Sequence, residues 1–83
     1  MNPRVETVEY KGNYRLQLTF TNGEVKVFDL KNYLHYPVYE PLKDESFCRQ
    51  AKVIDGIVTW NHEIDLDPDI AYLESGPMQA AVS

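Results

Sequence analysis

The sequence is short of cysteine, of basic residues and of long apolar runs, and each shortage excludes a class of protein. The single cysteine, Cys48, cannot form a disulfide within the chain. The 83 residues include 8 Lys and Arg against 13 Asp and Glu, and the resulting net charge of −5 disfavours unaided binding to nucleic acid or an anionic membrane. No apolar run approaches the roughly 18 residues of a membrane span, and the first residues lack the apolar segment of a signal peptide. We therefore expect one cytoplasmic domain.

Signals of catalysis and of cofactor binding are equally few. The four glycines, at positions 12, 23, 56 and 76, fall at expected turns or at a helix end, so none belongs to a phosphate-binding loop. His35 and His62 carry no ligand spacing, and a lone cysteine such as Cys48, beside Phe47, is most often a small buried hydrophobe. We expect no enzyme, no cofactor and no catalytic residue.

Alternating apolar residues predict a three-stranded antiparallel meander in the first third of the chain. One face of residues 14–20 carries only apolar side chains: Tyr14, Leu16, Leu18 and Phe20. A preceding strand turns at positions 12–13. Asn22-Gly23 suits a two-residue type I′ turn, which would set Phe20 opposite Val25 and Leu18 opposite Val27. In that register the apolar faces of the two strands coincide.

The middle of the chain predicts short helices and a second hairpin. Asp29 stands where the cap of a short amphipathic helix belongs, the prolines at 37 and 41 indicate a loop over residues 35–42, and residues 44–50 suit a second short helix. Residues 51–60 form a hairpin around Asp55-Gly56, with Val53 opposite Val58. Ile54 pairs with Ile57 at its tip, and exposed isoleucines there suggest contact with a neighbouring element or another chain.

Residues 60–72 gather acidic side chains and one histidine, which raises the question of a metal site. A calcium loop of the EF-hand type that began at Asp65 would need Gly and Glu where Ile70 and Gly76 stand. Asp67-Pro68-Asp69 instead has the order of a helix start: a capping Asp, a proline in the first turn and a second Asp at the positive end of the helix dipole. That position keeps the carboxylates ionised, which does not suit a general acid. We expect a capped helix with Ile70 and Leu73 as its apolar stripe, and no metal.

Together these elements predict an α+β fold: a three-stranded antiparallel meander plus a second β-hairpin, with two or three short helices on one face. Residues 1–76 form the single domain, and residues 77–83 form a flexible tail.

The order and spacing of several short motifs resemble the bacterial domain-of-unknown-function family 2442. The motifs combine a strand, an Asn-Gly hairpin and a strand with three later segments: Asp29, Leu30 and Leu34; Pro41, Leu42 and Asp44, with Phe47 one residue early; and Trp60, Asp65, Leu66, Pro68, Asp69 and Tyr72. The resemblance implies a small α+β domain that occurs alone, or before a helix-turn-helix domain, or encoded beside small proteins proposed to be toxins. It implies no activity, cofactor or catalytic residue. We expect no helix-turn-helix here, which removes a direct DNA-reading role.

The remaining candidates concern protein contacts. Six tyrosines are many for this length, and Tyr33, Tyr36 and Tyr39 cluster around the first prolines, where they suit either protein recognition or a loop packed by its own aromatics. Trp60, as the largest apolar side chain, belongs to the core. We expect a non-enzymatic protein-interaction module, antitoxin-like or a regulatory partner, whose unidentified protein partner is basic, with a homodimer as a further arrangement. The alternatives are a small-molecule sensor with a pocket behind Trp60 and, last, a compact enzyme that uses His62 with Asp65.

Overall fold

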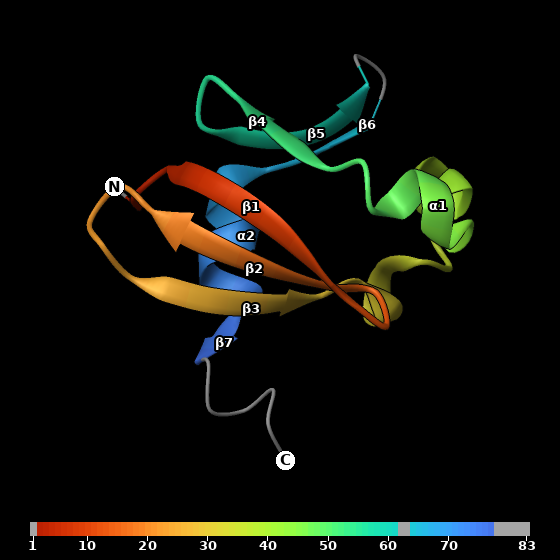
Figure 1. Cartoon of the computed structure of the whole chain (residues 1–83), viewed down its shortest axis with the longest axis horizontal. Coiled ribbons are helices and arrows are strands. Elements are labelled where there is room, and N and C mark those ends of the chain that lie inside the picture. The colour runs from red at the N-terminus through yellow and green to blue at the C-terminus, as the bar shows by residue number, and fades with distance from the viewer. Residues whose placement is uncertain (1, 62–63, 78–83) are drawn as a thin grey trace.

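The computed structural model describes residues 2–61 and 64–77, which form two antiparallel sheets packed together with short helices (Figure 1). The first sheet has the strand order β1 (Val5–Gly12), β2 (Arg15–Phe20), β3 (Val25–Asp29) and β7 (Gly76–Pro77). The second has the order β4 (Lys52–Ile54), β5 (Ile57–Asn61) and β6 (Ile64–Leu66). The helices are η1 (Leu30–Tyr33) and η2 (Pro37–Lys43), both of 3₁₀ type, α1 (Glu45–Cys48) and α2 (Pro68–Glu74). The α+β class is thereby confirmed.

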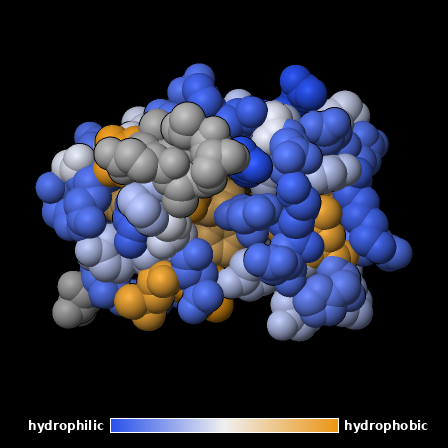
Figure 2. All heavy atoms as spheres, turned by 90° about the horizontal axis from the view of Figure 1, so that it is seen from below, coloured by the Kyte–Doolittle hydropathy of each residue, from blue (hydrophilic) through white to orange (hydrophobic). Residues whose placement is uncertain are grey.

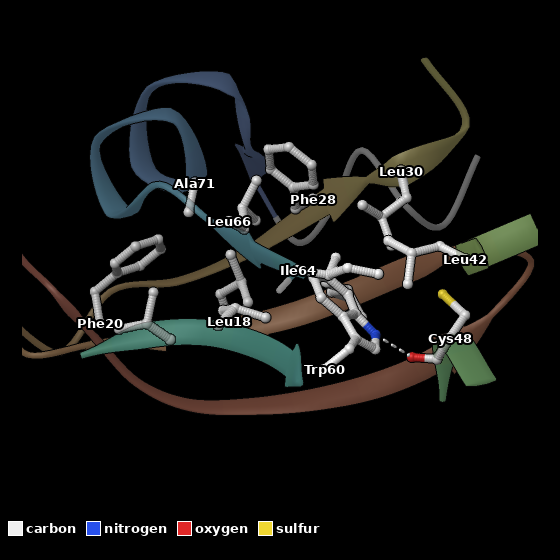
Figure 3. Close-up of a cluster of buried hydrophobic side chains, with 13 residues drawn as sticks. Leu18, Phe20, Phe28, Leu30, Leu42, Cys48, Trp60, Ile64, Leu66 and Ala71 are labelled. Atoms are coloured by element: carbon white, nitrogen blue, oxygen red, sulfur yellow. Dashed lines mark hydrogen bonds between the residues drawn. The ribbon is translucent and has the colours of Figure 1, made fainter. Parts of the chain in front are cut away.

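The core lies where the first sheet, the second sheet and α2 meet (Figure 3). The alternation predicted for β2 is confirmed, because Leu16, Leu18 and Phe20 are all fully buried. Trp60 from β5 and Ala71 from α2 complete this core, with exposed fractions of 4% and 0%. Full burial of a large apolar side chain contributes about 1.5–3 kcal/mol, so this interior accounts for much of the stability of so small a domain.

The register between β2 and β3 differs from the prediction by one residue. Leu18 lies opposite Lys26 and Leu16 opposite Phe28, because the chain turns through three residues, 21–23, and not through two. The amide of Gly23 donates to the carbonyl of Phe20 over 2.9 Å, and Gly23 itself has φ +92°, which is the arrangement of a type I turn followed by a left-handed glycine. The prediction that Val25 and Val27 face the core is therefore wrong.

Lys26 takes the inward position that the shifted register creates. Its ammonium lies 4.1 Å from the ring centre of Tyr72 and donates to the Tyr72 carbonyl over 2.9 Å, near the end of α2. A cation there complements the negative end of the helix and occupies the face of an aromatic ring. A lysine can thus replace an apolar residue on the inner face of β3.

The hairpin of β4 and β5 has the predicted register. Val53 lies opposite Val58 and Ile54 opposite Ile57, and the turn residues Asp55 and Gly56 have φ values of 55° and 80°. Positive φ at both central residues is the requirement of a type I′ turn. The prediction rested on that requirement, and the structure confirms it.

Residues 60–72 contain more than the start of a helix. Ile64 and Leu66 are buried on β6, which pairs with β5 and makes the predicted hairpin a three-stranded sheet. The helix start is confirmed, since the Asp67 carboxylate accepts from the amide of Asp69 over 2.8 Å. His62 and Glu63 lie outside the described residues.

The buried side of α2 is not the predicted stripe. Ile70 and Leu73 are 41% and 64% exposed, whereas Ala71 is fully buried and Tyr72 packs against the core with its ring centre 5.1 Å from that of Phe20. The small side chain of Ala71 lets the helix lie close to the sheet. After α2, Gly76 and Pro77 pair with Val27 and Lys26 of β3, so Pro77 is part of a strand, and the rest of the predicted tail lies outside the described residues.

Candidate functional site: a tyrosine surface

The loop predicted over residues 35–42 is largely the 3₁₀ helix η2, whereas η1 is the short helix predicted after Asp29. Tyr33 is the last residue of η1, Tyr36 is the cap of η2, and Tyr39 lies within η2. The Asp29 carboxylate caps η1 by accepting from the amide of Lys31 over 2.9 Å. The amide of Tyr36 then donates to the carbonyl of Tyr33 over 3.1 Å, and the amide of Tyr39 donates to that of Tyr36 over 2.9 Å. Tyr36 itself is extended, with φ −75° and ψ 135°, so the chain bends between the two helices and brings the rings of Tyr36 and Tyr39 back toward that of Tyr33.

The three rings form one group, which we call the tyrosine surface (Tyr33, Tyr36 and Tyr39). The ring centre of Tyr33 lies 6.2 Å from that of Tyr36 and 6.5 Å from that of Tyr39, within the range of favourable aromatic pairs. Phe28, fully buried, anchors the group because its ring centre is 5.1 Å from that of Tyr33. Tyr33 and Tyr39 pack against the core, as a loop packed by its own aromatics would, while Tyr36 remains 47% exposed; a role in protein recognition stays a prediction.

Acidic side chains lie near two members of the tyrosine surface, Tyr33 and Tyr39. Burial raises the pKa of Tyr33, and the charge of Glu74 on α2 raises it further. Burial also raises the pKa of Tyr39, with additional contributions from the charges of Asp65 and Asp67. The phenols therefore stay protonated and remain hydrogen-bond donors in a negative environment, and Tyr39 uses its hydroxyl to donate to the carbonyl of Asp65 over 3.3 Å. The carboxylates of Glu74, Asp65 and Asp67 thus give Tyr33 and Tyr39 negatively charged surroundings.

The other predicted signature residues serve the fold. Trp60 is buried, and its indole nitrogen donates to the Cys48 carbonyl over 2.8 Å (Figure 3). Asp67 caps α2, Pro68 is the first residue of that helix, and Asp69 accepts from the Asn2 side chain over 3.3 Å. Asp65 alone remains as a candidate for contact, because its side chain is exposed on β6.

Nucleophilic and metal chemistry find little support in the part of the chain that the structure describes. Cys48 is fully buried, and burial raises the pKa of its thiol to about 11, so the reactive thiolate is disfavoured. Among residues 2–61 and 64–77 no three His, Cys, Asp or Glu side chains are gathered as metal ligands would be. In the same residues no helix is long and apolar enough to cross a membrane.

The surface has no single dominant apolar face in the view from below the sheets. Figure 2 shows a mainly hydrophilic surface with hydrophobic atoms in separate patches. The exposed large apolar residues accordingly come from different elements: Val25, Tyr36, Val38, Ile54, Ile70 and Leu73. A surface of this kind suits contacts that mix aromatic and charged side chains better than the burial of one large hydrophobic patch.

Sequence reasoning found the three tyrosines and missed what surrounds them. Glu74 follows them by 35 or more positions and reaches Tyr33 only through the packing of α2. The contact between Tyr39 and Asp65 likewise depends on β6, a strand that was not predicted. The usable signal was Pro37, which stands at the first position of η2 and so marks a helix start and not a break, whereas Pro41 lies inside that helix.

The fold and site define a small α+β domain with a tyrosine-rich acidic surface. The family described as "Protein of unknown function (DUF2442)" matches residues 5–75, and the chain belongs to this family. The resemblance inferred from the motifs is thereby confirmed. No curated protein and no solved structure matches the chain.

Proposed function

We propose that this domain is a non-enzymatic protein-interaction module that binds a basic protein partner through the tyrosine surface. The observation that carries the proposal is the exposed ring of Tyr36, which packs against Tyr33, a residue whose own surroundings include the carboxylate of Glu74. Tyrosine supplies large contact area at low entropic cost and is enriched at interfaces. The net charge of −5 would speed encounter with a basic partner.

In its most concrete form the module is antitoxin-like: it covers a small basic protein and blocks that protein's activity. A regulatory partner of the same charge is recognised in the same way. Cytoplasmic location stays a prediction, as does a homodimer, for which the edge strands β1, β4 and β6 offer unpaired backbone groups.

The sensor alternative receives less support. It needs a cavity behind Trp60, whereas the indole is 4% exposed, packed in the core and hydrogen bonded through its nitrogen. A compact enzyme that uses His62 with Asp65 has no supporting observation among the described residues.

The test is affinity purification of the tagged chain from its own host at low salt, with native mass spectrometry of the eluate. We expect a stoichiometric basic protein, and a loss of about tenfold or more when Tyr36→Ser removes the exposed ring, as for a tyrosine hot spot. Val25→Ser is the matched control, because Val25 is 38% exposed on β3 and lies outside the tyrosine surface. Recovery of the bare chain, or equal losses for the two variants, would contradict the proposal.

A further inference from the structure

The outer face of the second sheet holds a pocket that the tyrosine surface does not include. Val58, Trp60, Ile64 and Leu66 point from this sheet into the core. The alternate positions therefore face outward, and they line an open pocket of about 270 Å³ formed by Ile54, Asp55, Ile57, Thr59 and Asp65. The turn of the hairpin and the edge strand β6 form two of its sides.

The walls of this pocket are apolar and two of its borders are acidic. Ile54 is 52% exposed and Ile57 is half-buried, so both present aliphatic surface to the pocket. Asp55 and Asp65 are exposed, and within residues 2–61 and 64–77 only their backbone carbonyls, and not their carboxylates, accept a hydrogen bond from a side chain. The Thr59 hydroxyl lies within 2.6 Å of the Asn61 carbonyl and 2.9 Å of the Ile64 carbonyl, which fixes its position while its lone pairs remain able to accept.

Arg4, a cation of the chain itself, already lies near Asp55, but it contacts the backbone carbonyl of Asp55 and not the carboxylate. The Arg4 guanidinium donates to the backbone carbonyl of Asp55 over 2.8 Å. That bond steadies the turn and leaves the Asp55 carboxylate for a second cation. The local chemistry thus combines aliphatic walls with a negative rim.

We propose that this pocket binds a long cationic side chain, lysine or arginine, from a basic segment of the partner protein. The aliphatic stem of such a side chain lies against Ile54 and Ile57, and its charged head reaches Asp55 and Asp65. Lysine and arginine have this division between an apolar stem and a charged end. A purely apolar ligand would leave both carboxylates unpaired, and a second copy of this acidic chain would bring like charges together.

The pocket is next to the tyrosine surface, and Asp65 belongs to the boundary between them. Asp65 lines the pocket, and its carbonyl accepts from the hydroxyl of Tyr39. A basic partner that covers Tyr36 and Tyr39 therefore meets the edge of the pocket as well. The inference rests on the proposed function and adds to it the class of side chain that the partner must present.

The experiment uses the four isoleucine methyl signals of the full chain in NMR at low salt, with hexalysine as the probe and hexaarginine as a second arm. Ile54 and Ile57 report on the pocket, whereas buried Ile64 and exposed Ile70 are internal controls. We expect saturable shifts at Ile54 and Ile57 only, and none with hexalysine acetylated on its side chains, which keeps the stem and removes the charge. Asp65→Asn and Asp55→Asn should each weaken the affinity about two- to fivefold, the range of an exposed ion pair.

Asp29→Asn is the matched control, because it removes one charge outside the pocket while Asn still caps η1. Three outcomes would each overturn the pocket inference. They are equal shifts with the acetylated peptide, equal weakening of the affinity by Asp29→Asn, and the absence of shifts at Ile54 and Ile57. If hexalysine shifts the ring of Tyr36 but not Ile54 and Ile57, the pocket inference fails and the tyrosine surface stands. If Ile54 and Ile57 respond but no basic partner is recovered from the host, the affinity of the pocket for cationic side chains stands, while the proposed function and the pocket's role in it fail.

Discussion

Replacing Gly56 by alanine should destabilise the fold more than the same change at two other glycines with similar backbone. Gly12, Gly23 and Gly56 have φ values of 87°, 92° and 80°, all in the left-handed region. A Cβ at Gly12 or Gly23 would meet nothing within 4 Å, whereas a Cβ at Gly56 would lie 2.5 Å from Nε and 2.9 Å from Cβ of Arg4. All three alanine variants therefore carry the energetic cost of positive φ, and only the variant at Gly56 also brings a Cβ into contact with Arg4.

The magnitudes follow from these two parts. The left-handed conformation costs an L-residue about 1–2 kcal/mol, and all three variants carry this cost. At Gly56 the new methyl group also displaces Arg4 and breaks the hydrogen bond from its guanidinium to the Asp55 carbonyl, which is worth about 0.5–1.5 kcal/mol. We expect Gly56→Ala to exceed the other two by about 1 kcal/mol, or by about 4–8 °C in Tm for a domain of this size.

Urea and thermal unfolding followed by circular dichroism measure the difference. Arg4→Ala in the Gly56→Ala background should add little, since the contact is already lost, while Arg4→Ala alone should cost the hydrogen bond. A double-mutant cycle with no coupling between positions 4 and 56, or equal losses at the three glycines, would refute the reasoning.

Three further predictions concern the thiol, alkaline pH and the helix cap. Cys48 should react with Ellman's reagent at pH 8 only at the rate of unfolding, because it is fully buried with its pKa raised to about 11; a fast reaction in native buffer would contradict this burial. The pKa of the folded Cys48 thiol lies above its ordinary value of 9.0, so its contribution to stability is complete below about pH 9 and is lost between pH 9 and 11. The raised pKa of Tyr39 acts in the same direction. The urea midpoint should therefore fall between about pH 8 and pH 10.5. Asp67→Ala should cost about 0.5–2 kcal/mol through loss of the cap on α2, while Asp67→Asn should be nearly neutral, and equal unfolding midpoints for the two would show that the cap contributes nothing.

Two of the hairpin turns, at Asp55-Gly56 and at Asn22-Gly23, show what the sequence could and could not predict. At Asp55-Gly56 both central residues take positive φ, so turn chemistry alone gave the right register. At Asn22-Gly23 only the glycine does, and the Asn22 side chain instead accepts from the amide of Glu24 over 3.0 Å. An Asn-Gly pair fits both loops, and the apolar pattern of β3 happened to favour the wrong one.

The acidic segment was mispredicted where tertiary packing decided the outcome. Three residues of alternation at β6 are too few to recognise as a strand from the sequence. Pairing with β5, which precedes residues 62–63, makes this segment a strand. The apolar pattern of α2 favoured Ile70 and Leu73, yet a seven-residue helix packs by close approach, and Ala71 permits that approach. Capping is local chemistry, and for that reason the start of α2 was predicted correctly.

The candidate site depends both on local turns and on tertiary packing. For this reason the sequence predicted its tyrosines but not the acidic side chains near them. The three tyrosines lie in one short stretch of chain, and two local turns, closed by the bonds from the Tyr36 and Tyr39 amides, bring their rings together. Their carboxylates come from α2 and β6, so the negative surroundings exist only in the folded domain. A partner that recognises aromatic rings and carboxylates together would therefore distinguish the folded module from its unfolded chain, which is the property that a masking protein requires.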